Sequence, residues 1–211
     1  KGSILYGLPF AKEAIRKAGY AVLVEGQMDT VACHEADLAQ TVASSGTALS
    51  ADQLHLLKRF TTTLHVAFDA DPAGEGAAER GIDAALDAGF DVRVIRMPLD
   101  TSGQPIAKDA DECIRKDADA WRHAVAHPVP VFDFYIERIR AKFDLRSPSG
   151  QRDAGHVLIQ HLAHVADPIE RAAWVRRCAE VIGVPDSAML EALRRMKSPI
   201  SSASSSAQAK H

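Results

Sequence analysis

Residues 21–29 read Ala-Val-Leu-Val-Glu-Gly-Gln-Met-Asp. The run at 21–24 is apolar and rich in β-branched valine, which predicts a short strand buried on both faces of a sheet. Gly26 lets the chain turn sharply after the strand. Glu25 is therefore expected at the carboxyl edge of the sheet, where open α/β sheets bind ligands.

The same pattern repeats outward from this stretch. Strands are expected at three further short apolar runs, 41–43, 64–68 and 92–95. Helical spacing lies between them, at 29–35, 50–60 and 73–88. This alternation predicts a mostly parallel central sheet flanked by helices.

The chain changes character after about residue 109. No further strand-like run is evident, and apolar residues recur three and four positions apart, so an all-α part should follow the sheet. Helices are expected at 131–143, 147–165, 167–183 and 186–196. Residues 197–211 are rich in Ser and Ala and are expected to form a disordered linker.

Composition narrows the class of protein. The 211 residues are 46% hydrophobic and 25% charged, and no apolar run approaches the ~20 residues of a membrane-spanning helix, so no membrane association is expected. Cys33, Cys113 and Cys178 lie far apart without a C-x-x-C pair, which predicts a reduced, cytosolic setting and no zinc site. Because the chain starts at Lys1, we expect a piece of a longer protein.

Charge differs between the two parts. Residues 1–120 hold 12 Lys/Arg against 19 Asp/Glu, a net of −7, whereas residues 121–211 hold 13 against 9, a net of +4. Concentrated carboxylates favour metal ions, and a basic part can face an anionic partner. Solvated surfaces would give the same division.

Acidic residues gather where predicted strands end or short loops begin. The clusters are Glu25 with Asp29, Asp69 with Asp71, and Asp109 with Asp111. In an extended D-x-D segment both carboxylates point to the same side and can share a hard divalent cation. The simpler alternative is that each acidic residue only caps a helix.

The order of these motifs resembles the TOPRIM domain of bacterial DnaG-type primases. The residues that carry the resemblance are Val24-Glu25-Gly26-x-Met28-Asp29, Ser45-Gly46-Thr47, Phe68-Asp69-x-Asp71-x-Ala73-Gly74 and Lys108-Asp109-x-Asp111-Glu112. The sequence departs from the family pattern at Gln27, at Ala70, at Ala110 and in a long loop over 99–108.

The resemblance implies four regions. They are a lead-in from a missing N-terminal subdomain (1–20), a TOPRIM catalytic domain (21–120), a helical subdomain (121–196) and the linker (197–211). It also implies a DNA-directed RNA polymerase that makes short RNA primers by nucleotidyl transfer, with little or no activity expected from this piece alone. Its setting would be the bacterial cytoplasm, at the replication fork.

The resemblance further implies site residues and partners. Mg²⁺, with Mn²⁺ as a substitute, would be bound by Glu25, Asp69, Asp71, Asp109 and Asp111, and Asp29 would belong to the same catalytic set. Lys1, Gly46 and Thr47 would contact the nucleotide. The partners would be single-stranded DNA template, ribonucleoside triphosphates and the replicative helicase, the last through an absent C-terminal domain, and the protein would be a monomer.

Other residues have simpler interpretations. The basic groups at 58–59, 138–142 and 176–177 are expected to be solvated helix faces rather than template contacts, and His156, His161 and His164 are expected to form a surface cluster. Two alternative functions stay open. One is metal-dependent DNA cleavage by a TOPRIM nuclease or topoisomerase, and the other is a non-catalytic metal- or nucleotide-binding module.

Overall fold

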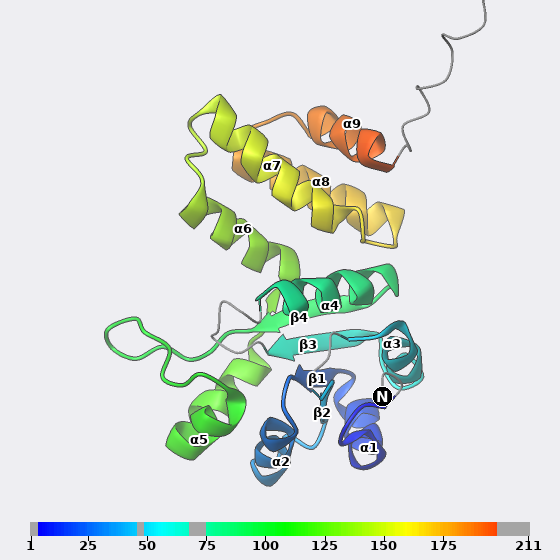
Figure 1. Cartoon of the computed structure of the whole chain (residues 1–211), viewed down its shortest axis with the longest axis vertical. Coiled ribbons are helices and arrows are strands. Elements are labelled where there is room, and N and C mark those ends of the chain that lie inside the picture. The colour runs from blue at the N-terminus through cyan, green and yellow to red at the C-terminus, as the bar shows by residue number, and fades with distance from the viewer. Residues whose placement is uncertain (1–3, 46–48, 68–74, 198–211) are drawn as a thin grey trace, which may run out of the picture.

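The computed structural model describes residues 4–45, 49–67 and 75–197. A sheet with its helices forms the lower half of the molecule in Figure 1, and a group of helices from the C-terminal part lies above it. The fold is therefore the expected one, a mostly parallel α/β sheet followed by an all-α part.

Five strands form the described sheet. Their order is β2 (Thr41–Ala43), β1 (Ala21–Val24), β3 (Thr63–Ala67), β4 (Asp91–Ile95) and β5 (Val129–Pro130). The first four are parallel, and β5 runs antiparallel to β4. The chain leaves β1 toward β2 and then returns to β3 on the other side of β1. The order of the strands thus reverses between β1 and β3, at the edge where Glu25 follows β1.

Side chains that alternate along the strands separate the helices into two layers. Val22, Val24, Ala67 and Ile95 share one apolar cluster with α2 (Gln27–Glu35) and α5 (Ala110–Ala126). Leu23, Val66 and Val94 face the other way, in a cluster with α1 (Leu8–Ala18), α3 (Ala51–Leu57) and α4 (Glu75–Asp87).

The helical part continues the second cluster. It consists of α6 (Val131–Lys142), α7 (Pro148–Leu162), α8 (Pro168–Ile182) and α9 (Asp186–Lys197). The predicted helix starts are confirmed, because Ser147 accepts a hydrogen bond from the backbone N–H of Gly150 and Asp167 accepts from those of Ile169 and Glu170.

The sequence-based prediction was wrong in one place, because it placed no strand after residue 109, yet β5 pairs with β4. Within the expected lead-in over 1–20, α1 packs Ala11 and Ile15 into the core, and Tyr6 makes an antiparallel bridge to Ala43 of β2. The domain boundary expected between residues 120 and 121 lies inside α5.

The cysteines and the helix lengths add two findings. Cys33, Cys113 and Cys178 are free thiols in buried positions. Among the residues that the model describes, no helix combines the length and apolarity needed to cross a membrane.

Candidate functional site

Glu25 and Gly26 form the turn between β1 and α2. Glu25 is half-buried, at the carboxyl end of β1, as the sequence predicted. Gly26 is the N-cap of α2, and a Cβ at this position would lie 2.6 Å from Oδ2 of Asp29. No side chain larger than glycine fits here without displacing the Asp29 carboxylate, so the turn and the carboxylate are packed as one unit.

Asp29 lies in the first turn of α2 and is 7% exposed. Its Oδ2 accepts a hydrogen bond from the backbone N–H of Gly26 at 3.1 Å, and its Oδ1 accepts from the backbone N–H of Asp111 at 2.9 Å. Burial raises the pKa of Asp29, a shift that the hydrogen bond from Asp111 opposes and the nearby Asp109 charge reinforces. Asp29 thus connects the start of α2 to the start of α5.

Asp109 and Asp111 lie at the N-terminus of α5. Asp109 is the N-cap, and its Oδ1 accepts from the backbone N–H of Glu112 at 2.8 Å. The expectation of an extended D-x-D segment was wrong for this pair, because only Asp109 has an extended backbone while Asp111 is already helical. Asp109 thus caps α5, and the charges of Asp109 and Asp111 both lie close enough to Asp29 to raise its pKa.

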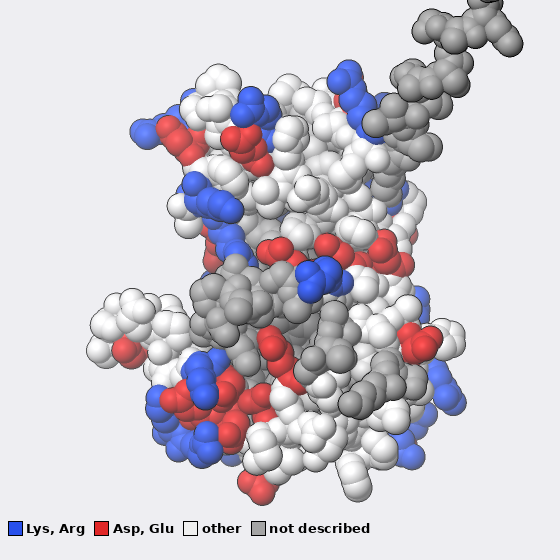
Figure 2. All heavy atoms as spheres, in the orientation of Figure 1, with Lys and Arg blue, Asp and Glu red and all other residues white. Residues whose placement is uncertain are grey.

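Basic side chains surround this acidic turn. Arg115 lies 2.8 Å from Oδ2 of Asp111, Lys108 lies 3.7 Å from Oδ2 of Asp109, and Lys116 lies 2.7 Å from Oε1 of Glu112. Figure 2 shows acidic and basic side chains intermixed on the part of the surface where α5 lies. The ion pairs of Arg115 and Lys116 were not predicted, although the spacing of Asp111 to Arg115 and of Glu112 to Lys116 is the i, i+4 signal of helical ion pairs.

The loop over 99–108 is closed by its own hydrogen bonds. The Asp100 carboxylate accepts from the backbone N–H groups of Ser102 at 2.8 Å and Gln104 at 3.0 Å, and the backbone N–H of Ile106 donates to Pro98 at 2.9 Å. The loop projects from the molecule as a closed turn (Figure 1). The loop therefore closes on itself before Asp109, and the first turn of α5 lies against Asp29.

Several predicted site residues lie outside the described residues. They are Lys1, Gly46, Thr47, Asp69 and Asp71. Among the residues that are described, no group of three or more His, Cys, Asp or Glu side chains is arranged to hold a metal ion. The acidic residues that are described offer carboxylate oxygens, the donors that Mg²⁺ prefers, so their chemistry fits that ion.

Basic groups at the end of α3 and in the helical part make contacts within the chain. Lys58 donates to the Ala88 carbonyl at 2.5 Å, Arg138 lies 3.9 Å from Glu79, and Arg177 lies 2.7 Å from Asp133. The expected surface cluster of histidines was wrong for His161, which is 6% exposed and contacts Asp83.

Models of two protein families match the chain. Residues 22–114 match the model described as Toprim-like, and residues 132–187 match the one described as the DnaB-helicase binding domain of primase. The first match covers β1 to β4 with α2 to the start of α5, and the second covers α6 to α8. The fold and the first match together identify residues 22–114 as a Toprim-like region.

Relatives and solved structures extend the match to nearly the whole chain. A DNA primase from Clostridium acetobutylicum is 33% identical over 198 residues, which cover 90% of this chain and 31% of the relative. A structure of the Aquifex aeolicus primase, with its zinc-binding and RNA polymerase domains, is 28% identical with a TM-score of 0.75 over 90% of this chain and 44% of that one. A DnaG primase catalytic domain bound to ssDNA is 26% identical with a TM-score of 0.74, over 89% of this chain and 58% of the other.

Over nearly its whole length the chain is thus similar to DnaG-type bacterial DNA primases, in the Toprim and helical part of their catalytic region. It spans about a third of the length of the curated relatives it matches. Helicase contact was expected through a domain beyond this chain, whereas the match to the helicase-binding family lies within the chain, at residues 132–187.

Proposed function

We propose that this chain supplies part of the catalytic centre of a DNA primase, which makes short RNA primers on a DNA template by metal-dependent nucleotidyl transfer. The observation that carries the proposal is the hydrogen bond between Asp29 and the backbone of Asp111 in the Toprim-like region, which joins the starts of α2 and α5 just beyond the carboxyl end of β1, where Glu25 lies and the strand order reverses. The relatives that match the chain are named DNA primases, so the nuclease, topoisomerase and non-catalytic alternatives are not favoured.

Mg²⁺ is the proposed cofactor, with Mn²⁺ as a substitute. Glu25, Asp109 and Asp111 would bind it together with Asp69 and Asp71. Carboxylate-bound Mg²⁺ lowers the pKa of an attacking hydroxyl and stabilises the charge that develops on phosphoryl oxygens. Arg115 and Lys108 hold Asp111 and Asp109 in the absence of metal, and they would yield their carboxylate contacts to the ion.

The substrates and partners are part of the same proposal. Ribonucleoside triphosphates would bind near Lys1, Gly46 and Thr47, and the template would be single-stranded DNA. A solved relative bound to ssDNA supports the template, and the helicase-binding family match supports contact with the replicative helicase through the helical part. We further propose a monomer that acts at the replication fork in the bacterial cytoplasm.

Primer synthesis by the longer protein tests the function, because this chain is about a third of its relatives. Glu25→Gln keeps the size of the side chain and removes its charge. We expect the rate of primer synthesis to fall by about a hundredfold or more, as for loss of a metal ligand or charge-stabilising group. Glu13→Gln is the matched control, because Glu13 is on the exposed surface of α1, where it pairs only with its neighbour Arg16 among the contacts described.

The same preparations should be incubated with supercoiled DNA and Mg²⁺. Nicking that Glu25→Gln abolishes, without primer synthesis by the unmutated protein, would replace the primase proposal with DNA cleavage. Equal rates of primer synthesis by Glu25→Gln and by the Glu13→Gln control would show that Glu25 has no part in catalysis.

A further inference from the structure

Asp29, which was expected in the catalytic set, joins two distant segments of the backbone. Its two carboxylate oxygens accept from backbone N–H groups of two different segments, Gly26 at the start of α2 and Asp111 at the start of α5. Gly26 and Asp111 are 85 positions apart in the sequence. One buried side chain therefore joins the turn that carries Glu25 to the turn that carries Asp109.

Each carboxylate oxygen of Asp29 already accepts a hydrogen bond from the backbone. Charge-assisted hydrogen bonds from backbone N–H groups to a carboxylate are among the stronger ones, and the 7% exposure of Asp29 shields them from water. The close approach of Oδ2 to Gly26, where a Cβ would lie at 2.6 Å, also fixes the carboxylate from the α2 side. Each oxygen keeps a second lone pair, so a metal ion bound by Asp29 would have to enter beside these N–H donors, at a side chain that is only 7% exposed.

A second contact joins the other ends of the same two helices. Nε of Arg122 in α5 donates to the carbonyl oxygen of Ala36, the C-cap of α2, at 3.0 Å. Between the two contacts, Cys33 and Cys113 lie in one buried apolar cluster with Trp121. The far ends of α2 and α5 are thus held independently of Asp29, and the ends that carry the acidic residues are held through it.

We infer that Asp29 is a positioning residue, whose carboxylate holds the first turn of α5 against the first turn of α2 and so sets Asp109 and Asp111 relative to Glu25. It acts through the backbone of Gly26 and Asp111 and does not contact metal or substrate. The importance of this arrangement for primer synthesis rests on the proposed function, but the connection itself does not.

Amide hydrogen exchange in metal-free buffer, followed by NMR on the whole 211-residue chain, tests the connection without any activity. In Asp29→Ala we expect the amides of Gly26 and Asp111 to exchange about tenfold faster or more, because each loses a charge-assisted hydrogen bond. In Asp29→Asn the remaining carbonyl oxygen can accept from one of the two N–H groups, so only one of these amides should be accelerated.

Two control variants distinguish loss of the Asp29 hydrogen bonds from a general destabilisation of the chain, which would also accelerate amide exchange. Asp52→Asn changes an exposed aspartate in the first turn of α3 and should leave both amides unchanged. Arg122→Ala removes the far contact between α2 and α5 and should also leave the Gly26 and Asp111 amides unchanged. Acceleration of both amides in Arg122→Ala to the extent seen in Asp29→Ala would mean that packing, not Asp29, holds the first turns together.

Mn²⁺ titration by calorimetry then distinguishes positioning from ligation. Weaker Mn²⁺ binding at unchanged stoichiometry, together with faster exchange in Asp29→Ala, agrees with positioning. Unchanged exchange in Asp29→Ala overturns the inference, and loss of one bound Mn²⁺ alongside it would make Asp29 a ligand. If the unmutated chain binds no Mn²⁺ but Asp29→Ala still accelerates both amides, the metal proposal fails and the positioning role stands.

Discussion

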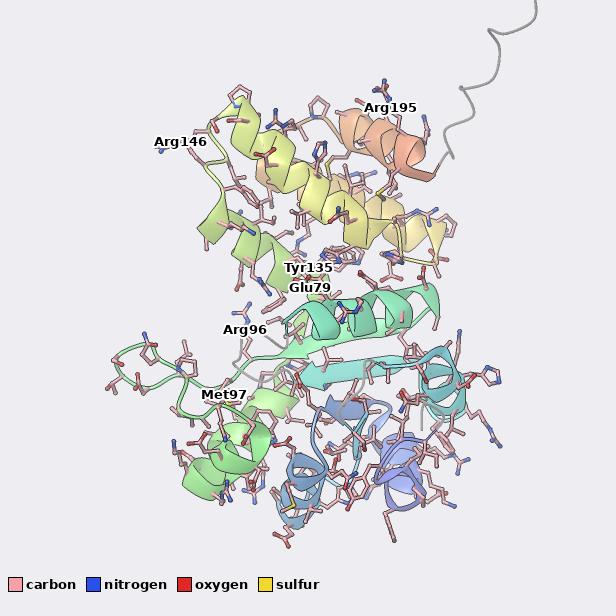
Figure 3. The ribbon with its side chains drawn as sticks, viewed as in Figure 1. Glu79, Arg96, Met97, Tyr135, Arg146 and Arg195 are labelled. Atoms are coloured by element: carbon pink, nitrogen blue, oxygen red, sulfur yellow. The ribbon has the colours of Figure 1, made fainter. Side chains whose placement is uncertain are left out.

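Nδ1 of His161 on α7 lies 2.8 Å from Oδ1 of Asp83 on α4, and this contact joins the helical part of the chain to the sheet. The His161 ring also stacks on Tyr135 of α6, with 4.0 Å between the ring centroids. Figure 3 shows Tyr135 beside Glu79 where α6 meets α4. Burial, with the Asp83 and Glu79 charges, raises the pKa of Tyr135, which therefore stays a neutral phenol at this junction.

His161→Phe tests this junction. The phenyl ring keeps the stacking on Tyr135 but cannot hydrogen-bond to Asp83, whose carboxylate is 22% exposed and would lose a partner. We expect the free energy of unfolding in urea to fall by about 1 to 3 kcal/mol. His156→Phe, at an exposed position of the same helix, should change it by less than about 0.5 kcal/mol. Equal effects of the two substitutions would show that the His161 contact adds nothing to stability.

The stability of the chain should also depend on pH through His65. This histidine is 6% exposed on β3 and stacks on Tyr20, and burial lowers its pKa from 6.5 to about 4. The unfolded chain therefore binds a proton at higher pH than the folded chain does. The stabilisation from keeping His65 neutral is complete above 6.5 and is lost as the pH falls toward 4, by up to about 3 kcal/mol.

Urea unfolding across this pH window checks the prediction. His65→Phe should flatten the pH dependence by the amount that His65 contributes. His55→Phe, at an exposed position of α3, should keep the slope of the unmutated chain. A slope that is unchanged in His65→Phe would assign the pH dependence to other groups.

The sequence predicted the strands of the sheet well because each is a short buried run with clear boundaries. β1 and β2 have the predicted bounds, and β3 and β4 begin one residue earlier than predicted. β5 was missed because it has two residues, one of them proline, and only its pairing with β4 makes it a strand. Patterns within a segment can be read from sequence, whereas pairing between distant segments cannot.

The same limit applies to the site. The rule that parallel strands end at one edge predicted that Glu25, Asp29, Asp109 and Asp111 would lie near one another. It could not predict that Asp29 bonds to the backbone of Asp111, 82 residues away, because that depends on how α2 and α5 pack. The contact of His161 with Asp83 was missed for the same reason, since neither residue has a local signal for its partner.

The cysteines should resist modification in the folded chain. Burial raises the pKa of Cys33 and Cys113 to about 11 and that of Cys178 to about 12. The reactive form is the thiolate, so both its population and its access to reagent are low. We expect alkylation by iodoacetamide near neutral pH to be about a hundredfold slower or more in native buffer than in urea. Rapid labelling of one cysteine in native buffer would identify a locally open segment, and peptide mapping by mass spectrometry would locate it.

Gly150 should be the least replaceable glycine of the helical part. It lies in the first turn of α7, and a Cβ there would be 2.1 Å from the carbonyl oxygen of Asp144, a backbone atom that also accepts from the Ser147 hydroxyl. Gly150→Ala must therefore open the turn before α7, and we expect the midpoint of urea unfolding to fall by an amount equivalent to more than about 2 kcal/mol.

Gly155→Ala is the matched control in the same helix, because its Cβ would meet the flexible end of Ile182 at 3.4 Å. The gain in helix propensity of about 1 kcal/mol should offset that contact and leave Gly155→Ala close to the unmutated chain. Equal stability of Gly150→Ala and Gly155→Ala would mean that the turn at 144–147 can move without cost, and that the start of α7 is not fixed by its contact with Asp144.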